Sequence, residues 1–349
     1  MAGGTGGHIF PGLALAKEMV SRGYRVAWLG TESGMESTLV PKENIEIHYI
    51  PVKGVRGKGL RSLLMAPWNI LSSITSAARI IREVKPSVVV GLGGFVAGPG
   101  GVAAKLKGRA LVIHEQNAIA GSTNKLLAKV ADKVLTAFPA VLNRGECIGN
   151  PIRKEIERII EPALRIKGRE SRIRLLVVGG SRGALAVNEL LPDAMALIEN
   201  SEQLDIWHQA GAGKNEATKA RYEAAGVTAR VDAFIDDMAE AFIWADVVVC
   251  RAGALTVSEL AAVGLGSILI PFPYAIDDHQ TANAKYLASQ GAAYLRQQSE
   301  LTSEKLAELL KSFIFDRTKL LDMACKARAL AKPQAVKIFA DYCEEVSCA

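Results

Sequence analysis

Two glycine-rich segments have the composition of turns that bind a negatively charged ligand. Residues 3–8 read GGTGGH, and residues 177–188 read VVGGSRGALAVN. Glycine lets a ligand approach the backbone closely, and the unpaired N–H groups at a helix start favour negative charge. The first segment departs from the dinucleotide fingerprint GxGxxG, because Ile9 stands at the third glycine position. We therefore expect phosphate-type turns and disfavour a nicotinamide or flavin enzyme.

A third segment combines a turn, a helix start and a carboxylate. Residues 250–259 read CRAGALTVSE, in which Arg251 and Gly253 end a predicted strand and a helix begins near Ala254. The N–H groups of that helix start can hold a diphosphate. Glu259 shares a helix face with Thr256, three residues earlier, so its carboxylate can accept hydrogen bonds from a ribose one turn below the phosphates. A surface glutamate on an amphipathic helix is the plainer interpretation of Glu259 alone.

Two side chains are candidates for proton transfer. His8 lies where the first glycine segment becomes a helix, and Glu115 belongs to HEQNAIAG at residues 114–121, directly after an apolar run. Ligands of open α/β sheets bind at the carboxyl ends of strands, which is where both side chains are expected. The alternatives are a helix cap or a packed ring for His8, and a solvated side chain for Glu115.

Further polar segments suit a sugar nucleotide, and none suits a metal. Gln280 and Asn283 in AIDDHQTANA can bind sugar hydroxyls, and the loop FIDDM at residues 234–238 can pair its backbone with a base edge. Adjacent Asp236 and Asp237 are not the spaced DxD that positions a divalent cation on a nucleotide diphosphate, and the sequence has no His/Cys cluster for zinc. We therefore expect no protein-bound metal and no cofactor.

The elements that must position these residues alternate between apolar runs and amphipathic stretches. Continuous apolar runs, rather than strict alternation, indicate parallel strands buried on both faces and hence an α/β fold. The candidate strands are residues 24–30, 87–93, 110–115, 174–180, 245–251 and 267–273.

The two halves of the chain repeat one order of elements, which predicts two doubly wound, Rossmann-like domains. We expect them at residues 1–153 and 154–331, with a linker at 148–156 and a C-terminal helix, about 332–349, that returns to the first domain. A strand should precede the first glycine turn, yet only Met1 and Ala2 do. We therefore expect a start codon placed too late or a truncated chain.

Charge is distributed unevenly along the chain of 349 residues. Residues 1–153 hold 19 basic and 9 acidic residues, and Glu83 is the only acid between Lys53 and Arg109. This excess predicts an anionic partner. We expect a peripheral contact with an anionic membrane, since basic residues are followed by apolar ones and no apolar run of 18 residues could span a bilayer. That segment comprises Lys53, Arg56, Lys58, Arg61, Leu63, Leu64, Met65 and Trp68.

Nucleic acid is the other class of anionic partner, and the sequence disfavours it. A nucleic-acid-binding module would interleave aromatic residues with its charges, whereas the basic stretch has only Trp68 and Phe95. The five cysteines are scattered without a CxxC pair, which is typical of reduced thiols in the cytosol.

Eight motifs, in order and over essentially the whole chain, resemble the MurG family of glycosyltransferases. They are GGTGGHIFPGLALA, GLGGFVAGPGG, HEQNAIAG, GNPIR, GGSRGA, FIDDM, RAGALTVSE and DDHQTANA. The resemblance implies the GT-B architecture, in which two Rossmann-like domains face each other across a cleft. Departures are Arg182 where relatives often have glutamine, His279 for the first of two glutamines, and Phe95 where some relatives have tyrosine.

The resemblance also implies the contacts with the nucleotide sugar. The matching positions are Thr5, Gly6, Gly7, Asn117, Arg153, Ser181, Ile235 (whose backbone would face uracil), Ala254, Leu255, Thr256, Val257, Ser258, Glu259 and Gln280. His8 and Glu115 remain the two candidates for the catalytic base, and the residues do not decide between them.

The activity implied is a single inverting displacement. N-acetylglucosamine would pass from UDP-N-acetylglucosamine to the C4 hydroxyl of the muramyl sugar of undecaprenyl-linked lipid I, giving lipid II at the cytoplasmic face of the inner membrane. The alternative is another GT-B enzyme that uses a UDP-sugar, either a diacylglycerol sugar transferase or a UDP-N-acetylglucosamine epimerase. The basic and apolar segment argues against the epimerase, which needs no membrane contact.

Overall fold

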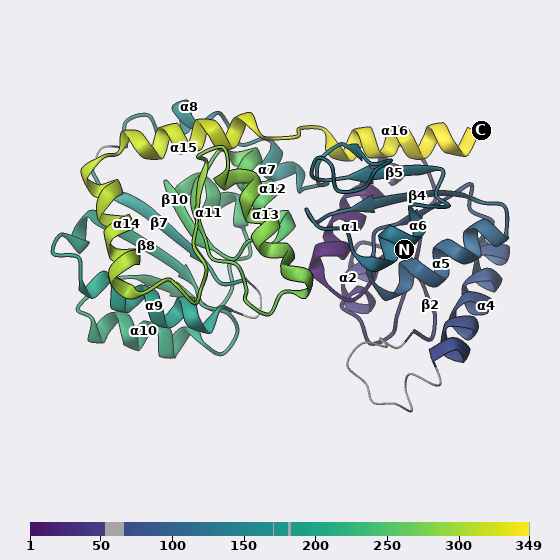
Figure 1. Ribbon diagram of the computed structural model, residues 1–349, viewed down its shortest axis with the longest axis horizontal. Helices are drawn as coiled ribbons and strands as arrows, with labels where there is room; N and C mark the ends of the chain where they lie inside the picture. The colour runs from purple at the N-terminus through teal and green to yellow at the C-terminus, as the bar shows by residue number, and fades with distance from the viewer. Residues whose placement is uncertain (53–65, 170, 181–182, 349) are drawn as a thin grey trace. The chain divides into compact units, whose positions relative to one another are not determined.

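The computed structural model describes residues 1–52, 66–169, 171–180 and 183–348, and its chain forms two compact units (Figure 1). Unit 1 comprises Met1–Ile152 and Gln334–Ala349, and unit 2 comprises Arg153–Pro333. Arg153, which the sequence prediction placed in the first domain, therefore belongs to unit 2. The last helix, α16, lies beside the N-terminal elements of unit 1 and contacts α1 (Figure 1).

Unit 1 contains two parallel sheets covered by helices. One sheet has the order β1-β2 and the other β3-β4-β5-β6. The strands are β1 Ala27–Gly30, β2 Glu46–Tyr49, β3 Val88–Gly91, β4 Ala110–Glu115, β5 Lys133–Thr136 and β6 Glu146–Cys147. The helices are α1 Gly6–Ser21, α2 Glu36–Lys42, α4 Ala66–Val84, α5 Gly94–Leu106, α6 Ser122–Leu127 and α16 Ala335–Cys348.

Unit 2 is built on one parallel sheet in the order β12-β11-β10-β7-β8-β9. Its strands are β7 Ile173–Val178, β8 Leu204–Gln209, β9 Arg230–Asp232, β10 Val247–Cys250, β11 Gly266–Leu269 and β12 Ala293–Leu295. Its helices are α7 Lys154–Glu157, α8 Pro162–Ile166, α9 Leu185–Ala196, α10 Asn215–Ala224, α11 Met238–Trp244, α12 Ala254–Val263, α13 His279–Ala288, α14 Ser303–Phe315 and α15 Thr318–Ala329, with the 3-10 turns η1 Ser201–Gln203 and η2 Ile276–Asp278.

The predicted parallel α/β class is confirmed in both units. Each strand pair described is parallel, and β10 and β11 are buried along their whole length. Chain order in unit 2 runs from β7 outward to β9 and then returns beside β7 with β10, so the strand order reverses between these two strands. Ligands of open α/β sheets bind at such a switch point, at the carboxyl ends of the strands.

Candidate functional site

The loop after β7 is one side of the switch point in unit 2. Gly180 and Gly183 have φ of 81° and 68°, a region that favours glycine. A Cβ on Gly183 would lie 2.1 Å from the carbonyl oxygen of Ala210, so a side chain is excluded there. The predicted ligand Ser181 and the variant position Arg182 lie outside the described residues.

The helix α12 begins on the other side of the switch point. Gly253 precedes it in extended conformation, and the helix starts at Ala254, so the N-terminal N–H groups lie at the carboxyl end of β10. The sequence predicted this helix start. Within the segment, Ala254 and Val257 are buried, Leu255 and Thr256 are partly exposed, and the Ser258 hydroxyl donates to the Ala254 carbonyl at 3.0 Å.

Glu259, one turn and a half into α12, forms an ion pair with Arg153. The Nη2 and Nε atoms of Arg153 lie 3.0 and 3.3 Å from one carboxylate oxygen, Oε1. The Glu259 side chain is 13% exposed and the Arg153 side chain 44% exposed. Burial raises the pKa of Glu259, and the Arg153 guanidinium opposes that shift. Two predicted ligand residues 106 positions apart in the chain are therefore brought together inside unit 2.

Other predicted donor-site residues brace the surrounding loops. The backbone N–H of Phe272 donates to Gln280 Oε1 at 2.9 Å, which ties α13 to the loop after β11. Asn283 donates to the Ala252 carbonyl at 3.2 Å, just ahead of α12. Asp237 caps α11 by accepting from the Glu240 N–H at 2.9 Å, and the Ile235 side chain is buried.

Arg251 also supports the loops of unit 2. Its guanidinium donates to the carbonyls of Ile270 and Pro271 at 3.2 and 3.1 Å and to Gln298 Oε1 at 2.7 Å. These bonds connect the end of β10 with the segments that follow β11 and β12. The loops that carry Gln280 and the start of α12 are thus held at one edge of the sheet.

In unit 1, the first glycine turn rests on a buried carboxylate that the sequence analysis missed. Glu36 is fully buried and accepts hydrogen bonds from the N–H groups of Gly4 and Thr31, at 3.1 and 2.9 Å, and from the Thr31 hydroxyl at 2.7 Å. Although burial acts to raise the pKa of Glu36, these donors lower it below its ordinary value. A Cβ on Gly34 would lie 2.1 Å from the Glu36 carboxylate, so glycine is required around it.

His8 lies between the two glycine turns of unit 1. Its Nδ1 is 3.2 Å from the hydroxyl of Thr5, the residue that precedes α1. A Cβ on Gly93 would lie 3.0 Å from His8 Nε2, and a Cβ on Gly94 would lie 2.4 Å from the carbonyl of Gly3. The motif GLGGFVAG therefore packs its glycines directly against the first turn, which places the imidazole beside Gly93.

The Glu115 carboxylate accepts hydrogen bonds from its own loop and from the helix that follows it, α6. One oxygen accepts from the Asn117 N–H at 3.0 Å and from Asn117 Nδ2 at 3.4 Å, and the other accepts from the Gly121 N–H at 3.0 Å and from Asn124 Nδ2 at 2.9 Å. The residue is only 2% exposed. Glu115 thus fixes the shape of HEQNAIAG, including the position of Asn117.

The neighbouring His114 is structural. Its Nε2 donates to the Gly149 carbonyl at 2.9 Å, and its ring stacks on Phe339 of α16. Complete burial lowers the pKa of His114 to about 4. The imidazole is therefore neutral at physiological pH. It connects the HEQNAIAG segment to Gly149 and to α16, the last helix of unit 1.

The predicted membrane segment is described only in part. Lys53, Arg56, Lys58, Arg61, Leu63, Leu64 and Met65 lie outside the described residues. Trp68 at the start of α4 is 69% exposed, and Ile70 and Leu71 are also exposed. Among the residues that the structure describes, no helix combines the length and the apolarity needed to cross a membrane. Those same residues contain no group of three or more His, Cys, Asp or Glu side chains suited to a metal ion.

Two protein-family models cover most of the chain. Residues 1–136 match the glycosyltransferase family 28 N-terminal domain, and residues 174–339 match the glycosyltransferase family 28 C-terminal domain. These matches identify the enzyme class and agree with the two α/β units.

Relatives that match nearly the whole chain are named as transferases, in agreement with the family models. Proteins from Saccharophagus degradans and Dechloromonas aromatica, both named UDP-N-acetylglucosamine–N-acetylmuramyl-(pentapeptide) pyrophosphoryl-undecaprenol N-acetylglucosamine transferase, are each 51% identical over 99% of this chain and over 90% and 98% of their own lengths. The crystal structure of Acinetobacter baumannii MurG is 43% identical with a TM-score of 0.88, covering 99% of this chain and 98% of that one. A glycosyltransferase of kitacinnamycin shares the fold at 16% identity, with a TM-score of 0.71 over 97% of this chain and 96% of its own.

Proposed function

Because the chain belongs to the MurG family of glycosyltransferases, we propose that it transfers N-acetylglucosamine from UDP-N-acetylglucosamine to the C4 hydroxyl of the muramyl sugar of undecaprenyl-linked lipid I. The observation that carries the proposal within the molecule is the Glu259–Arg153 pair beside the N-terminus of α12. It places a carboxylate and a cation at the switch point of the sheet in unit 2, where a nucleotide diphosphate is expected.

We assign donor binding to unit 2. The N–H groups at the start of α12 would hold the diphosphate, and Glu259 would accept hydrogen bonds from the ribose hydroxyls. Arg153 contacts only Oε1 in the described contacts and has a side chain that is 44% exposed, so it can turn toward the phosphates when the ribose arrives. As UDP departs, its new negative charge would be stabilised by the helix N-terminus and by Arg153. The FIDDM backbone at Ile235 and the Gln280 side chain would complete the contacts with uracil and sugar.

We assign proton transfer to His8 in unit 1. The acceptor oxygen attacks the anomeric carbon as the bond to UDP breaks, and its proton passes to the base. Glu115 already accepts four hydrogen bonds from its loop and from α6, and drawing a proton onto it would disrupt them. His8 is partly exposed, and its Nδ1 lies 3.2 Å from the Thr5 hydroxyl, a contact that would orient the imidazole beside the glycine turn.

We further propose that the enzyme works at the cytoplasmic face of the membrane, where its lipid-linked acceptor resides. The exposed Trp68, Ile70 and Leu71 supply an apolar contact on α4, and the basic excess of the first half of the chain attracts anionic headgroups. Such a contact is peripheral and reversible.

A donor-competition assay tests the proposed activity. Purified protein is supplied with labelled UDP-N-acetylglucosamine, UDP-glucose or UDP-galactose and a lipid-linked muramyl-pentapeptide acceptor in detergent. We expect transfer from UDP-N-acetylglucosamine alone, with UDP as the second product and with activity retained in EDTA. Equal transfer from UDP-glucose, or consumption of the donor by epimerisation without acceptor, would support the alternative UDP-sugar enzymes instead.

A further inference from the structure

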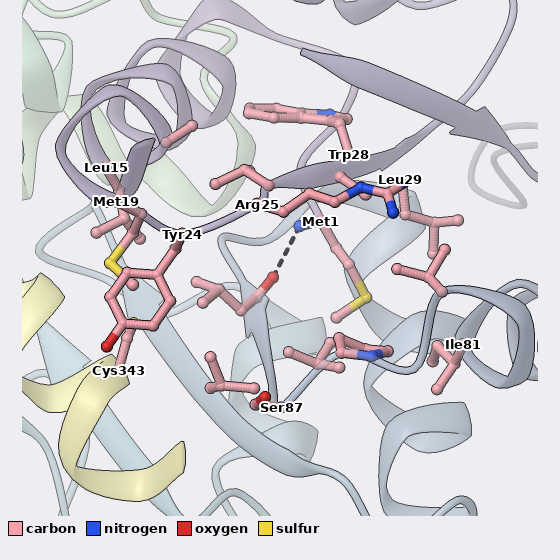
Figure 2. Close-up of a pocket in the computed structure, with 18 of the residues that line it drawn as sticks. Met1, Leu15, Met19, Tyr24, Arg25, Trp28, Leu29, Ile81, Ser87 and Cys343 are labelled. Atoms are coloured by element: carbon pink, nitrogen blue, oxygen red, sulfur yellow. Dashed lines mark hydrogen bonds between the residues drawn. The ribbon is translucent and has the colours of Figure 1, made fainter. Parts of the chain in front are cut away.

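Two places in the interior of the molecule differ in character. Beside β1 and β3 of unit 1, a cavity of about 410 Å³ has mainly apolar walls, which include Leu15, Met19, Trp28 and Ile81 (Figure 2). Between β8, α9 and α10 of unit 2, three buried polar side chains meet instead. A buried polar group costs stability unless it is hydrogen-bonded, so the second place makes strict demands on geometry.

The polar side chains are those of His208 in β8, Asn188 in α9 and Tyr222 in α10, each at most 2% exposed. His208 Nε2 lies 3.1 Å from Asn188 Oδ1, and His208 Nδ1 lies 2.9 Å from the Tyr222 hydroxyl. Asn188 Nδ2 donates to the Ala210 carbonyl at 2.9 Å. The three side chains thus form one continuous hydrogen-bonded path from α10 to the residue that follows β8.

The direction of each hydrogen bond in this path is determined. The Ala210 carbonyl can only accept, so the Asn188 amide turns Nδ2 toward Ala210 and Oδ1 toward His208. His208 Nε2 must therefore carry a proton. Burial lowers the pKa of His208 to about 3, so the imidazole is neutral and its Nδ1 accepts from the Tyr222 hydroxyl. The path thus holds the histidine in a single tautomer.

The path ends at the glycine loop after β7. The Ala210 carbonyl oxygen, which accepts from Asn188, is also the atom that would lie 2.1 Å from a Cβ on Gly183. The Gly179 N–H donates to the neighbouring Gln209 carbonyl at 3.1 Å. The loop therefore rests on the backbone of residues 209 and 210, and Asn188 lies near the start of α9, the helix that follows the loop.

We propose that His208 is a positioning residue for the sugar-nucleotide donor, which holds the glycine loop after β7 in place through Asn188 and Ala210. The proposal rests on the proposed function, in which the donor binds at the switch point beside this loop. The protonated Nε2 fixes the Asn188 amide, and that amide fixes the carbonyl against which Gly183 packs. Because His208 is fully buried, it acts through the loop, and its loss should weaken donor binding rather than slow the chemical step.

The test compares three variants of the full chain. His208→Leu removes the path, whereas His208→Gln can keep it, because a glutamine amide can donate to Asn188 and accept from Tyr222. Leu310→Ala is the matched control, since Leu310 is fully buried in the core of the same unit and takes no part in the path. Urea unfolding measures how far each variant is destabilised.

We expect His208→Leu to raise the KM for UDP-N-acetylglucosamine roughly tenfold, with kcat and the KM for the acceptor unchanged. His208→Gln should recover most of the donor KM, and Leu310→Ala should leave it unaltered. Hydrogen exchange at the Gly183 amide, measured without substrates, should become faster in His208→Leu and not in Leu310→Ala. Nitrogen NMR of the unaltered protein should find the His208 proton on Nε2.

An unchanged donor KM in a folded His208→Leu protein would overturn the proposal. Equal rises of donor KM in His208→Leu and Leu310→Ala would overturn it too, because general destabilisation would then be the cause. A His208 proton on Nδ1 would contradict the path itself, and this measurement stays decisive if His208→Leu does not fold. Absence of sugar transfer by the unaltered protein would instead contradict the proposed function, which the exchange and NMR measurements do not require.

Discussion

The two units of the molecule use buried carboxylates differently. In unit 1, Glu36 and Glu115 accept hydrogen bonds mainly from backbone N–H groups and side-chain amides of the loops and turns around them. In unit 2, Glu259 is held by one arginine whose side chain is 44% exposed. A carboxylate satisfied by backbone groups is committed to shaping a loop, whereas one paired with an exposed side chain can exchange that partner for a ligand. The partners of these carboxylates, rather than their burial, distinguish the two acids that shape loops from the acid that we propose binds the donor.

The strongest test of this comparison is the base assigned to unit 1. His8→Ala should lower the transfer rate by roughly 10²- to 10⁴-fold, the usual contribution of general base catalysis. The change is measured with saturating donor and lipid-linked acceptor. Thr5→Val removes the hydroxyl at Nδ1 and leaves the ring, so it should lower the rate by less than His8→Ala does. If His8→Ala keeps nearly full activity, Glu115 would be the catalytic base instead. The contrast between loop-shaping carboxylates in unit 1 and a ligand-binding carboxylate in unit 2 would then fail.

The next largest effect concerns membrane attachment, which we expect through unit 1 and not through unit 2. Changing Trp68, Ile70 and Leu71 to serine should lower affinity for anionic vesicles roughly tenfold or more, because each buried apolar side chain contributes about 1.5–3 kcal/mol. Phe315→Ser in unit 2 is the control, since Phe315 is 79% exposed. Co-sedimentation with vesicles measures both. Loss of binding in the Phe315 variant alone would move the membrane face to unit 2.

Glu36 should matter for folding rather than for donor binding. Glu36→Ala leaves three partly buried hydrogen bonds without their acceptor, so we expect a loss of about 3 kcal/mol of unfolding free energy. Glu36→Gln should recover part of it. The exposed Glu43, which pairs with Lys17, provides the control, and Glu43→Ala should cost at most about 1 kcal/mol. Urea unfolding that finds Glu36→Ala as stable as Glu43→Ala would show that the first glycine turn needs no such support.

The smallest predicted effect is a pH dependence that comes from one buried histidine in each unit. Burial lowers the pKa of His114 from 6.5 to about 4 in unit 1, and that of His208 from 6.5 to about 3 in unit 2. Both bases bind protons more readily when unfolded, so stability is complete above the unfolded value and falls as pH decreases. Between pH 6.5 and 5 each histidine should cost roughly 1–2 kcal/mol of unfolding free energy. His208→Gln should reduce the slope of unfolding free energy against pH in that window, and an unchanged slope would contradict the role of the buried His208.

Much of this arrangement could be predicted from sequence because it depends on local patterns. The apolar runs located β3, β4, β7, β10 and β11, and the glycine motifs located the starts of α1 and α12. The sequence analysis missed β2, β5, β6, β8, β9 and β12. Of these, β2 (EIHY), β6 (EC), β9 (RVD) and β12 (AYL) are short strands at sheet edges, whereas β5 (KVLT) and β8 (LDIWHQ) are interior strands in which polar residues interrupt the apolar run.

The hydrogen bonds and ion pairs between side chains of distant segments could not be predicted from the sequence. Glu36 stands in an ordinary polar stretch, TESGMES, and only the fold brings Gly4 and Gly34 around its carboxylate. The Glu259–Arg153 pair joins residues 106 positions apart. Periodicity reports which face of an element is buried, and it carries no information on which charged groups from distant segments meet there.

The division of roles between the units is tested most directly by titrating UDP into two variants in parallel by calorimetry. The account predicts that Glu259→Ala weakens UDP binding roughly ten- to hundredfold, since a hydrogen bond to a charged group is worth about 1.5–3 kcal/mol, whereas His8→Ala binds UDP as the unaltered protein does. Unchanged UDP affinity in a folded Glu259→Ala protein, or loss of UDP binding in His8→Ala, would contradict it.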